Sequence, residues 1–420
     1  MPLTSADAQA QRVEIVDVEK TSCCVVGGGP GGAMLALFLA RQGIPVILLE
    51  MHRDFDREFR GDTLHPAVLE ILDQIGLAAP IHGMRHSKAT GPTIQFSDGP
   101  FRPFDLTRLK TRFPYILLIP QSQFLEFITA EAAKYPSFKL VMGANVRNLV
   151  EENGVVLGVQ YLGSEGWHEV RAPLTVGADG RFSQLRQLAG IVPVRKSPPM
   201  DILWFRIPKL PQDLEVTGGV YGGIGRGRML IALDRVDYWQ AGLVFPKGQY
   251  PRLREQGVEA IRKTILEIEP RLAQHVESLT DWRQFSLLSV EASRCARWHR
   301  PGLLLIGDAA HVMSPVAGVG INYAIQDAAV AANVLSGPLK AGHVPESKLA
   351  EVQRQREWPT RVIQAMQDFF QKNLIANVLA ANQPARAPWQ LRLMTSVPGL
   401  RNIPARLFAF GARRVRLKEL

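Results

Sequence analysis

Residues 23–32 read CCVVGGGPGG, and this stretch decides the fold of the N-terminal part of the chain. The apolar run at 23–26 predicts a short strand buried in a parallel sheet. Residues 33–40 (AMLALFLA) are strong helix formers. Residues 44–49 (IPVILL) predict a second strand, which ends in Glu50. Strand, glycine turn, helix and strand in this order predict a βαβ unit.

Three glycines of this turn fit the spacing G-x-G-x-x-G, and each has a separate task. Gly27 permits the tight turn, Gly29 lets the backbone approach a pyrophosphate, and Gly32 lets helix and strand pack closely. The start of the helix supplies N–H groups and a positive dipole end for phosphates. Glu50, at the tip of the second strand, is placed to accept hydrogen bonds from ribose hydroxyls. The spacing alone is a weak signal, but the whole ordered series predicts a dinucleotide site.

A second glycine turn lies 280 residues further on, counted from Gly27 to Gly307. It follows the apolar run LLLI, so Asp308 stands at the end of a buried strand, where its carboxylate can bind a polyol chain. Pro315 fixes the next loop and is placed to aim its backbone carbonyl into a reaction cavity. The loop then reaches the start of a helix, where N–H groups can face an anion or an electron-rich ring edge: Gly318, Val319, Gly320, Ile321 and Asn322. One long ligand held at both ends favours FAD over a nicotinamide nucleotide alone.

Asp179 and Gly180 form a third loop at a strand end. An aspartate with a backbone N–H beside it can reach a pyrophosphate or a second nucleotide through a water or a ribose hydroxyl. Asp-Gly is also a very common turn, so this loop carries weight only together with the other two. His311, in the second glycine turn, is interpreted as a packed, hydrogen-bonded core histidine.

The chain has 420 residues, of which 46% are hydrophobic, and this predicts two or three domains. It has no run of 18 apolar residues, which argues against a membrane-spanning helix. The three cysteines, Cys23, Cys24 and Cys295, show neither a disulfide framework nor metal-ligand spacing. We therefore expect no metal and a cytoplasmic location.

The formal net charge of +10 is concentrated near the C-terminus. Residues 381–420 hold eight arginines and lysines against Glu419 alone. Nucleic-acid binding is a poor explanation, because no nucleic-acid motif accompanies the excess. A solvated basic tail and a weak contact with an anionic surface, such as a membrane, both remain open.

The pattern divides the chain into three parts. A nucleotide domain is expected from residues 1–90, 119–190 and 290–345. Aromatic residues, glycine turns and strand alternation in 202–245 predict an antiparallel sheet, so residues 91–118 and 191–289 are assigned to a substrate domain. Residues 346–420 form a helical, basic C-terminal segment.

In their order, the three glycine and aspartate loops resemble the FAD-dependent aromatic hydroxylases of the p-hydroxybenzoate hydroxylase type. The resemblance extends to Arg60, which precedes the next helix, and to Gln121, which starts another, and it covers roughly residues 20–345. It implies an α/β fold, α+β overall: a glutathione-reductase-type, Rossmann-like FAD domain with an inserted antiparallel-sheet domain. It also implies roles at FAD for Glu50 (adenosine ribose), Arg60 and Gln121 (pyrophosphate and ribityl chain) and Asp308 (ribityl chain), and for Asp179 at both FAD and the nicotinamide cofactor.

The same resemblance implies an NAD(P)H-dependent monooxygenase that hydroxylates an aromatic, phenolic or polycyclic substrate with O₂ through a flavin C4a-hydroperoxide. The flavin carries the chemistry while the protein binds, orients and excludes water, so no protein nucleophile is expected. No catalytic residue is assigned beyond the Pro315 backbone, with Arg206 and Tyr221 as weak pocket candidates. The wider set of pocket candidates is Trp204, Arg206, Tyr221, Arg228, Met229, Tyr238 and Trp239. The choice between NADH and NADPH and the oligomeric state stay open.

Three other functions compete with this one. A flavin halogenase shares the opening loop, but its Trp-x-Trp-x-Ile-Pro pattern is interrupted here by Phe205 and Arg206. A prenyl-lipid reductase or a quinone-pathway hydroxylase would use the basic, Phe-bearing segment 407–410 on a membrane. A protein that merely shelters a flavin would not turn over oxygen.

Overall fold

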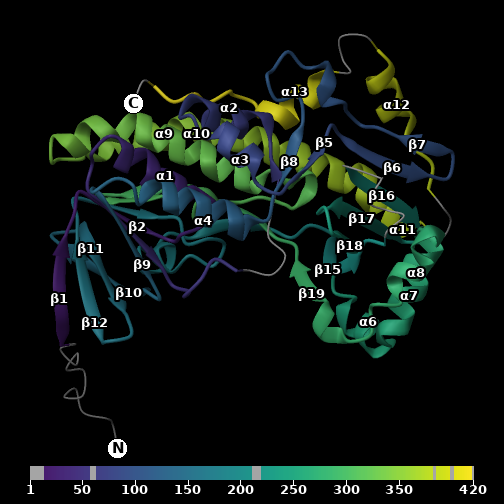
Figure 1. Ribbon diagram of the computed structural model, residues 1–420, viewed down its shortest axis with the longest axis horizontal. Helices are drawn as coiled ribbons and strands as arrows, with labels where there is room; N and C mark the ends of the chain where they lie inside the picture. The colour runs from purple at the N-terminus through teal and green to yellow at the C-terminus, as the bar shows by residue number, and fades with distance from the viewer. Residues whose placement is uncertain (1–13, 57–62, 211–218, 382–384, 398–401, 419–420) are drawn as a thin grey trace, which may run out of the picture.

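The computed structural model describes residues 14–56, 63–210, 219–381, 385–397 and 402–418. Figure 1 shows two parts side by side, one around a parallel sheet and one around a larger antiparallel sheet, with long helices across the top. The predicted α/β fold with a second, antiparallel sheet and a C-terminal helical segment is confirmed.

The first part is built on a six-stranded sheet in the order β21-β22-β13-β2-β3-β9. All neighbours are parallel except β21 and β22. Its strands are β2 (Cys23–Val26), β3 (Val46–Glu50), β9 (Phe138–Met142), β13 (Leu174–Gly177), β21 (His299–Arg300) and β22 (Leu303–Leu305). Alternate residues of β2 enter different cores, because successive side chains of a strand point to opposite faces: Cys23 and Val25 face the helices, Cys24 and Val26 the opposite side.

Helices cover one face of this sheet and a second sheet covers the other. The helices are α1 (Pro30–Arg41), α2 (Pro66–Gln74), α3 (Ala78–Gly83), α4 (Gln121–Ala132) and α9 (Gly320–Lys340). The covering sheet has the order β1-β12-β11-β10: β1 (Ile15–Lys20), β10 (Asn145–Glu152), β11 (Val155–Leu162) and β12 (Trp167–Arg171). The short helix α5 (Gln184–Leu188) follows β13 and packs beside this sheet.

Two three-stranded sheets link this part to the next. One has the order β4-β8-β5, with β4 (Thr63–Leu64), β5 (Ser87–Ala89) and β8 (Ile116–Leu118). The other has the order β14-β20-β23, with β14 (Pro193–Lys196), β20 (Ala292–Cys295) and β23 (His311–Val312).

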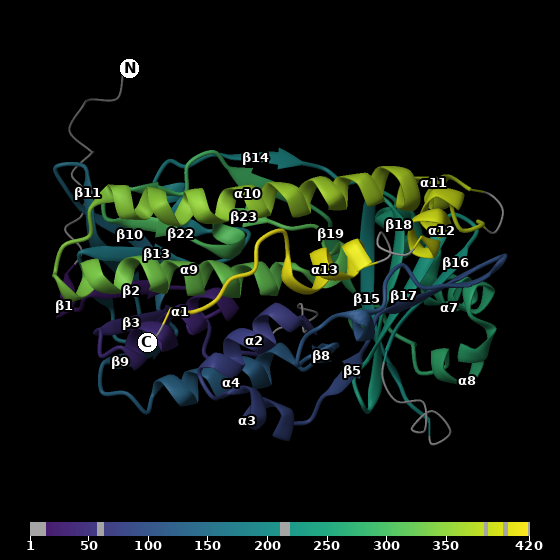
Figure 2. The same ribbon diagram turned by 90° about the horizontal axis from the view of Figure 1, so that it is seen from above.

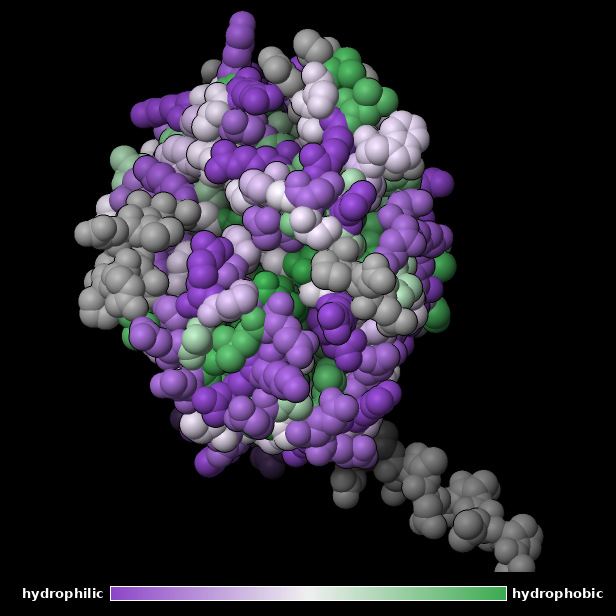
Figure 3. All heavy atoms as spheres, turned by 90° about the vertical axis from the view of Figure 1, so that its right-hand side faces the viewer, coloured by the Kyte–Doolittle hydropathy of each residue, from purple (hydrophilic) through white to green (hydrophobic). Residues whose placement is uncertain are grey.

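The second part is a seven-stranded sheet in the order β19-β15-β18-β17-β16-β6-β7, antiparallel except for the pair β16 and β6. Its strands are β6 (Pro92–Phe96), β7 (Gly99–Phe101), β15 (Met200–Pro208), β16 (Val220–Gly225), β17 (Arg228–Asp234), β18 (Tyr238–Pro246) and β19 (Ser286–Ser289). Helices α6 (Tyr250–Glu255), α7 (Gly257–Ile268) and α8 (Ala273–Val276) cover one face, which we call the outer face. Figure 3 shows this end of the molecule, where hydrophobic side chains form separate groups among hydrophilic ones.

The C-terminal helices connect the two parts. Figure 2 shows α10 lying beside α9 along the parallel sheet and reaching the antiparallel sheet at its far end. A π-helical turn at Gln371–Ile375 continues α10 (Glu346–Phe370) into α11 (Ala376–Ala380), followed by α12 (Trp389–Ser396) and α13 (Asn402–Phe410). Ile375 and Leu379 pack on the second face of the seven-stranded sheet, which we call the inner face.

Candidate functional site

The N-terminal glycine turn has little room for side chains at two of its three signature positions. Gly27 has a φ of +105°, and an added Cβ would lie 2.5 Å from the carbonyl carbon of Ala178. An added Cβ on Gly32 would lie 2.0 Å from the backbone oxygen of Gly27. The first glycine thus serves the turn and the third serves the contact between helix and strand, as the sequence predicts.

Gly29 differs, because no contact of the described protein requires a glycine there. Its φ of −68° is ordinary, and an added Cβ would meet no described heavy atom within 4 Å. Gly29 is the N-cap residue of α1 and therefore borders the N–H groups of the first helical turn. Open space directly at a helix N-terminus is what a phosphate group needs.

Glu50 ends β3 beside this turn. Its Oε2 accepts the backbone N–H of Gly28 (2.8 Å), and its Oε1 accepts the backbone N–H of His52 (3.0 Å). The carboxyl group is buried and also lies 2.6 Å from Nδ1 of His52. Glu50 therefore holds the glycine turn itself, and it lies at the strand end where a ribose would be bound.

The second glycine turn meets the first at Ala324 in α9. An added Cβ on Gly31 would lie 3.3 Å from the Cβ of Ala324, and one on Gly307 would lie 3.0 Å from it. The two loops, 280 residues apart in sequence, are thus neighbours at one end of the parallel sheet. Asp308 follows Gly307, and its Oδ1 would lie 4.0 Å from a Cβ on Gly320, the first residue of α9.

The third loop is tied to the second. Asp179 accepts hydrogen bonds from the hydroxyl of Ser183 (2.6 Å) and from the backbone N–H of Leu185 (3.0 Å), so its carboxylate supports the start of α5. Burial raises the pKa of Asp179, although these hydrogen bonds oppose the shift. From the same helix, Nη1 of Arg186 donates to the backbone oxygen of Ala309 (2.9 Å). The structure therefore brings this loop next to Gly27 and Ala309. The carboxylate of Asp179 binds residues that follow it in the same loop.

Two groups at the start of α9 form hydrogen bonds within the protein. The side chain of Asn322 is taken up by the protein: Nδ2 donates to the backbone oxygen of Thr63 (2.8 Å), and Oδ1 accepts the N–H of His65 (2.7 Å). The carbonyl of Pro315 accepts the N–H of Gly318 (3.0 Å) and so closes a turn within the loop, rather than serving only a cavity. The first intrahelical bond runs from the N–H of Tyr323 to the oxygen of Val319 (3.0 Å). The N–H groups ahead of it, at residues 320–322, are those a helix leaves for a ligand.

Two further predicted residues complete the list. Gln121 is the first residue of α4, which packs against α1 and follows β8, the partner strand of Thr63. Arg60 lies outside the described residues.

The predicted pocket residues fall on both faces of the seven-stranded sheet. Trp204 and Met229 lie on the inner face, where they pack with Val316 of the second loop. By strand alternation Arg206 shares the face of Trp204, and its guanidinium lies 5.2 Å from the ring centre of Tyr238.

Tyr221, Arg228 and Trp239 lie on the outer face, away from the second loop, and their place in a substrate pocket stays a prediction. Burial and a hydrogen bond to Glu269 raise the pKa of Tyr221 to about 12. Arg228 donates to Gln249 (3.0 Å), and Trp239 packs in the core under α6–α8. A one-residue offset along a strand changes the face, and the sequence did not show which face would meet the cofactor loop.

A buried charged cluster behind the second glycine turn was missed. Asp327 accepts from the backbone N–H of Gly307 (3.0 Å) and from Nε of Arg356 (2.6 Å), and its Oδ2 lies 2.6 Å from Nε2 of His311. Burial alone would raise the pKa of Asp327, but His311 and Arg356 hold it below its ordinary value. His311 is thus a packed, hydrogen-bonded residue, as predicted, and Asp327 fixes the glycine turn in place.

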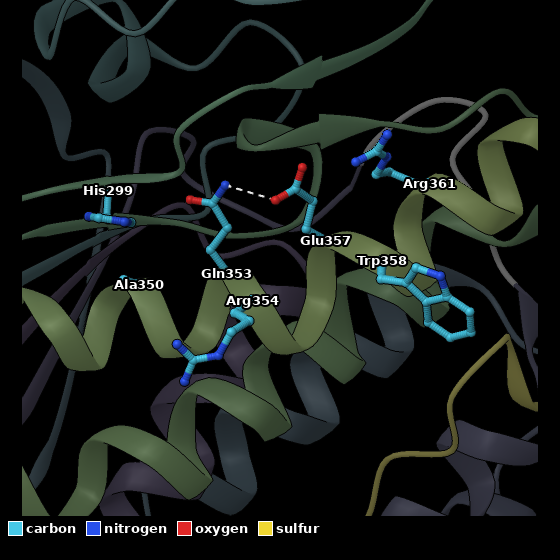
Figure 4. A pocket seen from close by; sticks show the side chains of 7 residues that line it. All are labelled: His299, Ala350, Gln353, Arg354, Glu357, Trp358 and Arg361. Atoms are coloured by element: carbon cyan, nitrogen blue, oxygen red, sulfur yellow. Dashed lines mark hydrogen bonds between the residues drawn. The ribbon is translucent and has the colours of Figure 1, made fainter.

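A surface cavity of about 330 Å³ lies elsewhere, along residues 350–361 of α10 and beside His299. Figure 4 shows its lining, with Gln353 donating to Glu357 (3.2 Å) and Trp358 and Arg361 further along the helix. It contains none of the predicted site residues, so we do not assign it to the cofactor.

The basic C-terminal segment is largely folded onto the protein. Phe408 is buried and stacks on His65, with 4.3 Å between ring centres. Arg414 pairs with Glu70, and Arg392 pairs with Asp98 (2.8 Å). Phe408, which the membrane alternative would place in lipid, therefore packs inward. Among the described residues, no helix has the length and hydropathy of a membrane span, and no group of three or more His, Cys, Asp or Glu is arranged to hold a metal ion.

Comparison with known proteins supports one type of cofactor for these loops. Residues 20–369 match the family model of the FAD binding domain. The chain is 34% identical over 407 residues to a 6-methylpretetramide 4-monooxygenase of Streptomyces rimosus, across 96% of this chain and 95% of that protein.

Solved structures show the same fold. The anhydrotetracycline hydroxylase OxyS from Streptomyces rimosus superposes with a TM-score of 0.75 at 25% identity, covering 95% of this chain and 77% of that one. PqsL of P. aeruginosa, solved in complex with 2-aminobenzoylacetate, gives a TM-score of 0.74 at 21% identity, with 86% and 99% covered. The second likeness concerns the fold alone.

Proposed function

Because this chain belongs to the FAD-dependent aromatic hydroxylase family, we propose that it hydroxylates a polycyclic aromatic substrate with O₂ and with NADH or NADPH as reductant. The protein is an FAD-dependent monooxygenase. The observation that carries the proposal is the meeting of the two glycine turns at Ala324, with open space at Gly29. The residues present fit FAD, because each of the two glycine turns leads into the N-terminus of a helix, α1 and α9.

Each group would then have one task. The N–H groups at the start of α1 would bind the pyrophosphate, and Glu50 the adenosine ribose. Asp308 would bind the ribityl chain, and the N–H groups at 320–322 would face the electron-rich edge of the flavin ring. The inner face of the seven-stranded sheet, with Trp204 and Met229, would hold the substrate against this ring and exclude water.

The overall reaction balances with one O₂. An aromatic C–H becomes C–OH, the second oxygen atom leaves as water, and NAD(P)H with one proton supplies two electrons and becomes NAD(P)⁺. When bound, FAD would supply hydride acceptance and oxygen activation. The protein's part is to orient the substrate carbon and to keep the site dry.

A polycyclic substrate is supported by the similar 6-methylpretetramide monooxygenase, which this chain matches over nearly its whole length. We further propose that residues 1–90, 119–190 and 290–345 serve the cofactor and that residues 91–118 and 191–289 serve the substrate. A reducing, cytoplasmic location fits the three free cysteines, all of which are buried.

The test starts from an absorbance spectrum of the purified protein, which should show bound flavin. Oxidation of NADH or NADPH should accelerate when a fused-ring phenol is added, and the product should carry one added oxygen atom. A protein that takes up no FAD would overturn the proposal, and so would a product formed only with bromide or chloride present.

A further inference from the structure

One face of α10 is polar and yet buried. Its buried polar side chains, with that of Gln371 just after its end, recur at steps of three or four residues: Gln353, Arg356, Thr360, Gln364, Gln367 and Gln371. Residues spaced by three and four share a helix face, so these side chains form a single stripe. Buried polar groups need partners, and Gln364, Gln367 and Gln371 find partners in residues 312–316 of the second glycine loop.

Gln367 holds two carbonyl groups of this loop. Its Nε2 donates to the backbone oxygen of Ser314 (2.8 Å) and to that of Val316 (2.8 Å). One turn earlier, Nε2 of Gln364 donates to the backbone oxygen of Val312 (3.1 Å). The side-chain amides of Gln364 and Gln367 thus hold the backbone carbonyls of residues 312, 314 and 316.

Gln371 binds a side chain of the same loop. Its Nε2 donates to the hydroxyl of Ser314, which is itself buried. The residues just before Pro315 are therefore fixed to α10 at both backbone and side chain.

The residues held by Gln364, Gln367 and Gln371 lie next to a strained turn. Ala317 has a φ of +71° and Gly318 a φ of +60°, and a non-glycine residue in this region costs about 1–3 kcal/mol unless its surroundings enforce it. On the far side of the turn, the hydroxyl of Thr63 donates to the backbone oxygen of Gly318 (2.9 Å). The turn at the start of α9 is thus held from α10 on one side and from β4 on the other.

The same end of α10 touches the substrate side. The π-helical turn begins at Gln371, and its last residue, Ile375, belongs to the hydrophobic cluster on the inner face of the sheet that includes Ile202, Trp204 and Val316. Helix α10 therefore contacts both the flavin loop and the sheet that would carry the substrate.

We propose that Gln367 and Gln371 are positioning residues of the monooxygenase site. They set the place of residues 314–318, and hence of the helix start that faces the flavin, relative to the inner face of the sheet. The proposal rests on the proposed function, since it concerns the geometry of flavin against substrate.

The main test is Gln367→Met, which keeps length and approximate volume but donates no hydrogen bond. FAD affinity should fall about ten-fold. At saturating FAD and substrate, a larger share of NAD(P)H electrons should appear as hydrogen peroxide instead of hydroxylated product, and the absorbance bands of the bound flavin should shift. The matched control is Gln355→Met on the same helix, because Gln355 donates only to Glu351 within α10 (3.3 Å).

Two weaker variants keep the test valid if Gln367→Met does not fold. Gln371→Met and Ser314→Ala each remove the bond between these two side chains, and they should give the same increase in peroxide. A Gln367→Met protein with lowered thermal stability but unchanged FAD affinity, flavin spectrum and peroxide share would overturn the proposal, because the residue would then be only structural.

A readout without FAD separates this proposal from the proposed function. In the apoprotein, Gln367→Met should increase amide hydrogen exchange at residues 314–318 relative to Gln355→Met. Failure of the wild-type protein to bind FAD would refute the proposed function. Unchanged amide exchange at residues 314–318 would refute the proposal that Gln367 positions this loop.

Discussion

Asp327 accepts the backbone N–H of Gly307 at 3.0 Å, directly before the predicted ribityl ligand Asp308. The same carboxylate is the partner of the fully buried Arg356. Asp327→Asn would leave this arginine without its counter-charge, and breaking such a pair costs about 3–5 kcal/mol. Urea unfolding of the apoprotein measures the loss. Asp281→Asn, at an exposed pair with Arg283, is the control and should leave the midpoint unchanged.

Gly29→Ala should separate cofactor binding from stability. The position has an ordinary φ and open space, so the apoprotein should melt at the same or a slightly higher temperature. A methyl group in the space of the pyrophosphate should weaken FAD binding by about ten-fold or more. Gly337→Ala, in α9 and likewise without a described atom within 4 Å of its Cβ, is the matched control. Equal FAD affinity in both variants would show that no phosphate lies at Gly29.

His65 should make the fold sensitive to acid. Burial lowers its pKa from 6.5 to about 4, although the hydrogen bond to the carbonyl of Phe408 opposes the shift. The unfolded chain therefore binds a proton at higher pH than the folded one, so stability is complete above pH 6.5 and falls between pH 6.5 and 4. At pH 5 the loss from this group is about 2 kcal/mol. Thermal midpoints measured from pH 7 to 5 should fall less steeply for His65→Gln than for wild type, and equal slopes would contradict the assignment.

Two tryptophans test which face of the sheet meets the substrate. Trp204 lies on the inner face with Val316, whereas Trp239 lies on the outer face with Lys209 over its ring. Trp204→Phe should raise KM for the aromatic substrate several-fold with little change in stability. Trp239→Phe should leave KM unchanged, and the opposite result would move the substrate site to the outer face.

The parts of the site that follow from local chemistry were predictable. Residues 23–50 combine an apolar run, a glycine turn, helix formers and a terminal acid, and each element forms for a reason contained in its own residues. Glu50 ends β3 and Asp308 follows β22, as the pattern indicated.

The parts of the site that depend on tertiary contacts could not be predicted from the sequence. At the end of α10 the apolar residue Phe369 is 58% exposed, while Gln364, Gln367 and Gln371 are buried. Glutamine on a helix is ordinarily a solvent-facing residue, and only the carbonyls opposite it reveal its role. Asn322 was predicted to bind the cofactor because of its place in the motif, and the sequence did not show that its side-chain amide would bind the chain at Thr63 and His65, which leaves the backbone N–H for a ligand.

The parallel pair of β6 and β16 joins Pro92 to Val220, which is 128 residues further along the chain. During synthesis the β6–β7 hairpin leaves the ribosome long before its partner strand exists. Its apolar residues Ile94, Phe96 and Phe101 then have no sheet to join, and pairing over such a separation is slow. The β6–β7 hairpin can therefore complete its sheet only after translation has passed β16.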